Sequence, residues 1–274
     1  MSIELKQIVT VAQKEFWERI RNRWVLAVSI IFAAFALIIA YFGTAQQGAV
    51  GFSSIDMTIA SLVSLAIYLI PLIALILGYD AIVGEREHGS LDLLLSLPIT
   101  RLELLLGKFV GLSAALSFPV IAGFGVAGIF LSYSISIPQL LDYFAFLLSS
   151  IVMGLTFLSM SILVSTISRS KVIASGAAIA LWFVYVLVYD LLLMGLLVAA
   201  GSRIGSNVFP LLLLLNPADI YRVANILSME NVKVLYGLAT AFPATLASPW
   251  VLYGMMLFWI IAPLGIAYLR FKKQ

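Results

Sequence analysis

The residues best suited to chemistry lie in one polar segment between two long apolar runs, Gly84–Arg101. Within six positions, Glu85–Ser90, it gathers two glutamates, a serine and the only histidine of the chain. Gly84 and Gly89 have the spacing of a nucleotide phosphate-binding loop, but Ser90 stands where that loop requires a lysine. No nucleotide-binding fold surrounds the segment. We therefore expect ATP, with its magnesium, to bind to another polypeptide, and the chain itself not to be an enzyme.

Metal chemistry has little support in the sequence. Glu85, Glu87 and His88 resemble a fragment of a hydrolytic zinc site, but one histidine without a second ligand pair at helical spacing argues against a membrane-embedded protease. The chain has no cysteine, which removes thiolate ligands and cysteine nucleophiles. Met153 and Met160 are seven residues apart and share a helical face, which suits copper or ordinary packing. We predict no metal site, and this methionine pair is the alternative.

The composition places these residues in a membrane. The chain of 274 residues is 63% hydrophobic and 11% charged, whereas a soluble domain carries about 25% charged residues. Six apolar stretches are long enough to cross a bilayer without strict alternation, which predicts helices rather than strands. They are residues 24–43, 57–80, 109–133, 140–167, 172–199 and 250–269. We expect an all-α polytopic protein with a single permease domain over residues 1–274.

The basic residues predict the orientation of these spans. With the N-terminus inside, the inner segments hold 13 of the 16 lysines and arginines, and the remaining three fall in one outer segment, 200–249. Both termini are therefore expected in the cytoplasm of a bacterium or archaeon, with the protein in the inner membrane. Because the net charge of +3 is explained by topology, we exclude nucleic acid as a partner.

Three aspartates interrupt the apolar runs, where a charge is costly and therefore suggests a role. Asp142 lies in the first turn of the fourth span, where an acid favours the helix dipole, so we expect it to be structural. Asp80 lies near the cytoplasmic end of the second span, and we expect it to pair with Arg86 or Arg101 or to cap the following loop. Asp190 lies in the outer half of the fifth span. It either hydrogen-bonds a neighbouring helix or lines a path.

Three further elements follow from local patterns. Residues 3–23 are apolar at steps of three and four and predict an amphipathic helix in the cytoplasmic interface. The cytoplasmic connection 84–107 predicts a short helix capped by Ser90 and stopped by Pro98, and Thr100 with Glu103 predicts a capping box for the next helix. In the outer segment, Asn216 followed by proline predicts the start of another short helix.

Small residues suggest where helices approach one another. Gly123, Gly125 and Gly128 lie in the third span. Such glycines allow the backbones of membrane helices to come close, so we expect them to pack rather than to bind a ligand.

The polar connection resembles a family signature. Glu85–Leu91, Leu94–Pro98 with Arg101, and Leu106–Lys108 are similar to the pattern E-x-E-x-G-T/S-L, L-x-x-P-x-x-R and G-K of ABC-2-type permeases. The resemblance covers nearly the whole chain. It implies a homodimer that works with a cytoplasmic ABC ATPase, and a coupling helix between spans 2 and 3. The residues that it assigns to ATPase coupling are Glu85, Arg86, Glu87, His88, Gly89, Ser90, Leu91, Asp92, Pro98 and Arg101.

Within that family, Arg21–Trp24, Tyr79–Glu85 and Leu215–Arg222 are similar to permeases that serve the maturation of nitrous oxide reductase. This resemblance implies a periplasmic copper-binding partner on the outer face, with copper on that partner. Its expected contact residues are Asn216, Asp219, Tyr221 and Arg222.

Three functional hypotheses remain open. The scarcity of soft copper ligands in the spans favours a permease that transmits force from the ATPase to the outer surface. Alternatively, polar residues of the fourth span line a path for copper, a sulfur species or a lipid; they are Ser149, Ser150, Thr156, Ser159 and Ser161. The third hypothesis is a passive scaffold for a periplasmic complex.

Overall fold

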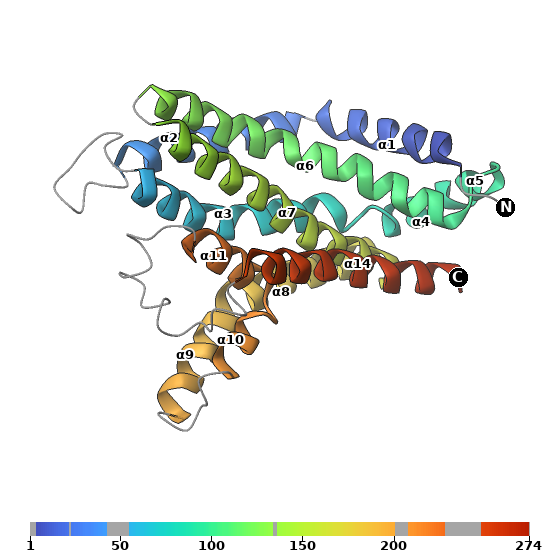
Figure 1. The fold of residues 1–274 in the computed structure, drawn as a ribbon. Coiled ribbons are helices and arrows are strands. Elements are labelled where there is room, and N and C mark those ends of the chain that lie inside the picture. The colour runs from blue at the N-terminus through green and yellow to red at the C-terminus, as the bar shows by residue number, and fades with distance from the viewer. Residues whose placement is uncertain are drawn as a thin grey trace.

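The long helices form a bundle. The computed structural model describes residues 4–21, 23–42, 55–133, 136–200, 208–227 and 248–273, and in this part of the chain the secondary structure is helical, with no strand. The bundle helices are α2 (Arg23–Phe42), α3 (Ile55–Gly78), α6 (Arg101–Ser132), α7 (Ile137–Ile167) and α14 (Pro249–Lys272). Figure 1 shows both chain ends at one end of this bundle. The expected all-α architecture is confirmed.

Shorter helices occupy the ends and one side of the bundle. They are α1 (Leu5–Ile20), α4 (Val83–Glu87), α5 (Ser90–Ser96), α10 (Val208–Leu213) and α11 (Pro217–Leu227). A bent helix is formed by α8 (Lys171–Phe183), the π-helical η2 (Val184–Val188) and α9 (Tyr189–Ala200). In Figure 1, α9 and α10 project away from the bundle, and α5 lies at the end that holds both chain termini. We call this end the α5 end.

Five helical stretches of the described residues are long and apolar enough to cross a membrane. They are Asp56–Glu87, Arg101–Ser132, Ile137–Ile167, Lys171–Leu196 and Pro249–Lys272. They correspond to the second to sixth expected spans. The first expected span coincides with α2, whose described apolar part, Ala27–Ile39, is shorter. The six-span topology with cytoplasmic termini therefore stays a prediction. Of the predicted outer segment 200–249, residues 201–207 and 228–247 lie outside the described residues.

Helix α7 is the centre of the bundle and packs against α3, α6, α11 and α14. Its buried hydroxyl groups bind different neighbours along its length. Ser161 Oγ donates to Leu75 O of α3 at 2.7 Å, and Ser159 Oγ donates to Trp259 O of α14 at 3.0 Å. In an apolar interior such side chains join helices, because no water competes for their hydrogen bonds. The hydroxyls therefore fix which helices surround α7.

Helix α1 lies directly against α6, side by side along the bundle (Figure 1). Two glycines of α6 allow this contact. A Cβ atom at Gly107 would lie 2.6 Å from Val11 Cβ, and one at Gly111 would lie 2.5 Å from Ala12 O. The G-x-x-x-G spacing puts both glycines on one face of α6, and their missing side chains admit the backbone of α1.

Only two of the three glycines that were expected to pack closely lie against a neighbouring helix. A Cβ at Gly123 would collide with the Phe32 ring of α2, and one at Gly128 would lie 2.7 Å from the Tyr143 ring of α7. A Cβ at Gly125 would meet no atom of the described residues within 4 Å. The expectation is confirmed for the first two and wrong for Gly125, because that residue points away from the neighbouring helices.

We predict that Gly111→Ala destabilises the protein. The added methyl group would collide with the backbone of α1, and overpacking of this kind costs about 1–3 kcal/mol. The midpoint of thermal unfolding of the purified protein measures the effect. Gly125→Ala is the matched control, since its methyl group enters open space and alanine favours a helix by about 0.5–1 kcal/mol. Equal midpoints for both variants would contradict the close α1–α6 contact.

Candidate functional site

The polar connection forms two short helices joined by a tight turn. Helix α4 ends at Glu87, and Gly89 turns the chain with a φ of 71°, a left-handed conformation that favours glycine. Helix α5 begins at Ser90 with Gly89 as its N-cap, so the prediction that Ser90 caps this helix is wrong. The Ser90 hydroxyl instead donates to the Glu85 carboxylate and, at 3.2 Å, to the Glu85 carbonyl. Glu85 attracts the hydroxyl because it is charged and close by in the chain.

Helix α5 presents an apolar and acidic face outward. Leu91 is buried, whereas Leu93 is 71% exposed and Asp92 is also exposed. The helix ends at Ser96, two residues before Pro98, as a proline disfavours helical backbone before it. Exposed leucines beside a charge suit contact with another protein.

The next helix begins as its sequence predicts. Thr100 accepts a hydrogen bond from Glu103 N, and the Glu103 carboxylate accepts one from Thr100 N at 2.7 Å, which confirms the capping box. The same carboxylate accepts a 2.6 Å hydrogen bond from Glu4 N, ahead of α1. Glu103 therefore ties the start of α6 to the start of α1.

A buried lysine joins three elements at this junction. Lys108 of α6 is 2% exposed, and its Nζ binds the Glu15 carboxylate of α1 and, at 3.1 Å, Glu85 Oε1 of α4. Glu15 is also 2% exposed. A buried charge is stable only when it is paired, so the two glutamates and the lysine depend on one another. We call Glu15, Lys108 and Glu85 the junction triad.

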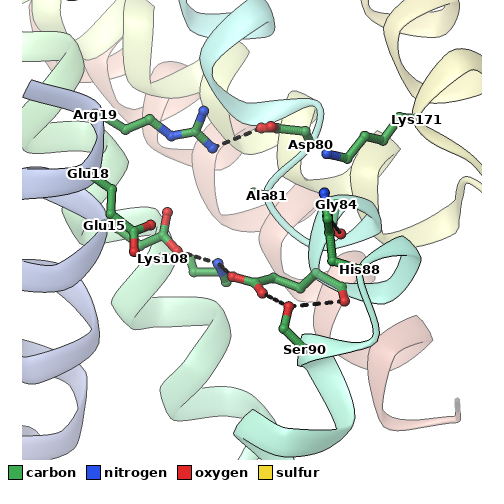
Figure 2. A pocket seen from close by; sticks show the side chains of 11 residues that line it. Glu15, Glu18, Arg19, Asp80, Ala81, Gly84, His88, Ser90, Lys108 and Lys171 are labelled. Carbon is green, nitrogen blue, oxygen red and sulfur yellow. Dashed lines mark hydrogen bonds and ion pairs between the residues drawn. The ribbon is translucent and has the colours of Figure 1, made fainter. Parts of the chain in front are cut away.

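Asp80 has a different partner from the one expected. Its carboxylate binds Arg19 of α1 at 2.8 Å, and Figure 2 shows Arg19 reaching across the pocket toward it. The expected pairing with Arg86 or Arg101 is wrong. Those arginines are held elsewhere, because each binds backbone carbonyls at the end of another helix.

The other charged residues of the connection bind neighbouring helices. Arg86 Nη1 donates to Ser168 O of the α7–α8 corner at 3.0 Å, and Glu87 accepts from Lys171 N at 2.8 Å. His88 Nδ1 lies 2.7 Å from Gly84 O. Arg101 donates to Phe271 O at 2.6 Å and lies over the Phe271 ring, which fixes the end of α14. These side chains hold the connection in place rather than extend from it.

The polar groups surround a pocket of about 310 Å³ (Figure 2). Its charged lining comes from α1, α4, α6 and α8 and the turn after α3. The charged residues are Glu15, Glu18, Arg19, Asp80, Glu85, Lys108 and Lys171. Among the described residues, no group of three or more histidines, cysteines or acids is placed to hold a metal ion. Met153 and Met160 are buried within the hydrophobic core.

A second polar cluster lies on the outer side of the predicted topology. Arg222 of α11 binds Asp190 of α9 at 2.9 Å and Asp219 at 2.7 Å, so Asp190 does bind a neighbouring helix. Burial raises the pKa of Asp219 to about 7, with Arg222 lowering it and Asp190 adding to the rise. Two carboxylates therefore share one guanidinium.

The predicted partner-contact residues of α11 are mostly interior. Asn216, Asp219 and Tyr221 are no more than 1% exposed, whereas Arg222 is partly exposed. Asn216 Oδ1 accepts from Ala218 N at 3.0 Å at the start of the helix. The first three side chains thus offer little surface to another protein, because the polar face of α11 turns toward the bundle.

Comparison with known proteins decides the family. A family profile described as "ABC-2 family transporter protein" matches residues 9–274. The chain belongs to the ABC-2 transporter family. Two similar relatives are each named "Probable ABC transporter permease protein NosY". The one from Stutzerimonas stutzeri is 42% identical over 98% of this chain and 99% of its own length, and the one from Pseudomonas aeruginosa is 40% identical over 97% and 98%. The protein is thus a NosY-like permease, the membrane component of an ABC transporter rather than its ATPase.

Two residues of α1 that bind at this site were not identified from the sequence: Glu15, the partner of Lys108, and Arg19, the partner of Asp80. Glu15 has a sequence signal: it shares the inner face of α1 with Val11 and Ala12, and a carboxylate on that face implies a buried cation. Arg19 lies one turn further on. Their partners are 93 and 61 residues away in the chain, so no local pattern identifies them.

We predict that Lys108→Met destabilises the permease strongly. The change leaves Glu15 and Glu85 without their buried cation, and breaking such a pair costs about 3–5 kcal/mol. The midpoint of thermal unfolding is the measurement. Lys14→Met is the matched control, because the Lys14 side chain is 47% exposed and lies 3.8 Å from the same Glu85. Adding Glu15→Gln and Glu85→Gln to Lys108→Met should recover much of the loss. A triple variant as unstable as the single one would show that packing, not charge, is responsible.

Proposed function

We propose that this permease couples ATP hydrolysis by a separate cytoplasmic ATPase to a conformational change at the opposite face of the membrane. The exposed face of α5 is the docking surface in this proposal, and residues 85–101 are the coupling element. The junction triad supports it, since it binds α4 to α1 and α6 by buried charges. A push on α5 would move these elements together.

The observation that carries the proposal is that α7 bonds to the start of α4 near its own C-terminal end and to α11 near its middle, 15 residues or about 22 Å along the helix. At the α5 end, Ser165 Oγ accepts the backbone N–H groups of Ile82 and Val83 at 2.9 and 3.0 Å. Farther along, Ser150 Oγ lies 2.8 Å from Tyr221 Oη of α11. A helix of 31 residues is about 46 Å long. Helix α7 thus connects the coupling element to α11 as a rigid rod.

The same hydroxyls argue against a polar path through one chain. Ser149, Thr156 and Ser159 are fully buried, and each hydroxyl binds a carbonyl of its own helix. Ser149 also accepts from Asn225 of α11 at 3.0 Å. Groups that are already satisfied by neighbouring helices do not form a lined channel, which favours force transmission over passage of a substrate.

The biological setting that we propose follows from the similarity to NosY permeases. Two permeases would assemble with two NosF-like ATPases in the bacterial inner membrane, and ATP with magnesium would bind to those ATPases. A NosD-like copper-binding protein would dock on the periplasmic face. The movement would serve copper-site maturation of nitrous oxide reductase, with copper held by that partner.

Spin labels at the outer ends of helices test this proposal. Because the chain has no cysteine, Tyr133→Cys and Trp250→Cys introduce unique attachment sites, and both residues are at least 85% exposed. In the permease–ATPase complex we expect ATP to shift the distance between the labels by at least about 2 Å relative to ADP. Ser165→Ala should reduce this shift. Ser113→Ala is its control, because that hydroxyl binds its own helix.

An unchanged distance in the wild-type complex would contradict force transmission. If ATP then still drives copper, sulfide or lipid across sealed vesicles, the substrate-moving hypothesis is correct. If nothing moves and activity in cells does not need the ATPase, the permease is a passive scaffold.

A further inference from the structure

An apolar groove runs between α3 and α8. It has a volume of about 420 Å³ and is lined by Leu72, Ile76 and Tyr79 of α3 and the turn after it, and by Ser175, Ile179 and Trp182 of α8. On each helix these residues follow one another at steps of four and three, so each helix contributes one face. Trp182 Nε1 donates to Tyr68 O at 2.9 Å, which holds the indole ring in place.

At the α5 end, this groove adjoins the charged pocket of Figure 2. Tyr79 lines the groove, and the next residue, Asp80, lines the pocket. Lys171 lines the pocket and lies one helical turn before Ser175, on the face of α8 that forms the groove wall. An apolar hollow and a charged hollow thus follow one another along the bundle, and this is the distribution of polarity in a phospholipid.

Within the part of the chain that the structure describes, Lys171 is the charged group of the pocket that is left without a counter-ion. Each acid of the pocket lies within 4 Å of a basic side chain: Glu15 and Glu85 at Lys108, Glu18 at Lys14 and Asp80 at Arg19. Among the described residues, no carboxylate oxygen lies within that distance of Lys171 Nζ.

Space at Gly84 lets this lysine reach the pocket. A Cβ at Gly84 would lie 3.0 Å from Lys171 Cε, and Figure 2 shows the side chain extending from α8 toward that glycine. Arg169, two residues earlier, lies at the same corner. Arg86 also binds this corner, at a backbone carbonyl, and Glu87 accepts from Lys171 N there at 2.8 Å. The three basic side chains that the structure describes at this corner therefore outnumber its one carboxylate.

We propose that the α3–α8 groove and Lys171 bind one phospholipid of the leaflet at the α5 end. An acyl chain would occupy the groove, and the phosphate would bind the Lys171 ammonium. Basic side chains between helices on the cytoplasmic side are a recurrent site for anionic headgroups. The charge selects the lipid, because acyl chains meet apolar helices anywhere on the bundle. This site is independent of ATPase coupling.

Native mass spectrometry of the purified permease–ATPase complex, supplemented with phosphatidylglycerol, tests the site. Lys171→Ala should lower the retained lipid at least five-fold by removing the phosphate partner. Lys272→Ala, an exposed cation at the end of α14, should retain as much lipid as the wild type. Ser175→Phe should have the effect of Lys171→Ala by filling the groove. Val172→Phe is its control, since Val172 is 80% exposed and lies outside the groove.

Two results would overturn the proposal. The first is equal lipid retention by Lys171→Ala and the wild type. The second is a Ser175→Phe variant that retains the lipid but no longer forms the permease dimer, which would show that a second copy of the chain covers the groove. The two measurements are lipid retention and formation of the permease dimer. Neither depends on ATP-driven movement.

Discussion

The ammonium group of Lys108, buried between two carboxylates, is the interaction on which the α5 end of this permease depends. It is supplied by α6, and its partners Glu15 and Glu85 come from α1 and α4. In an interior with little water, a lone charge is far less stable than a paired one. Removal of any member of the junction triad therefore leaves a buried charge without its partner, which destabilises the protein. The glycines at 107 and 111 flank the lysine and let α1 approach closely enough for the pair to form. Charge and close packing therefore act at one place. Together they join the proposed coupling element to α1 and α6, so that it would not move without them.

Hydroxyl groups give the rest of the bundle its connections. Helix α7 binds α3, α4 and α14 through Ser161, Ser165 and Ser159, and it binds α11 through two further serines. Apolar side chains alone do not specify which helices meet in a membrane, because lipid is as apolar as leucine. Hydrogen bonds at defined positions along α7 do specify which helices pack against it. The consequence for function is that one continuous helix contacts both the proposed docking side and the outer helix α11.

Local patterns predicted local structure well. The Thr100–Glu103 capping box, the start of α11 after Asn216 and the positions of the apolar helices were all readable from neighbouring residues. The predictions that were wrong concerned side chains whose partners are distant in the sequence. Asp80 pairs with Arg19 rather than with Arg86, which is nearer in the sequence, because the packing of α1 on α6 brings Arg19 close to Asp80. Similarly, buried Tyr221 has its hydroxyl partner in Ser150 of α7, 71 residues away. Gly89 capped α5 in place of Ser90 because the Glu85 carboxylate attracted the serine hydroxyl, a competition that a capping rule does not contain.

The most direct test of the account is hydrogen exchange of the permease–ATPase complex in the presence of ATP and of ADP. The central claim is that α1, α4 and α6 remain one unit held by the junction triad while α11 responds. We expect the backbone amides of Val11–Glu15 to exchange equally slowly with both nucleotides, and those of α11 to exchange at different rates. Faster exchange at Val11–Glu15 in one nucleotide state, with α11 unchanged, would contradict the claim, because α1 would then separate from α6 during the cycle.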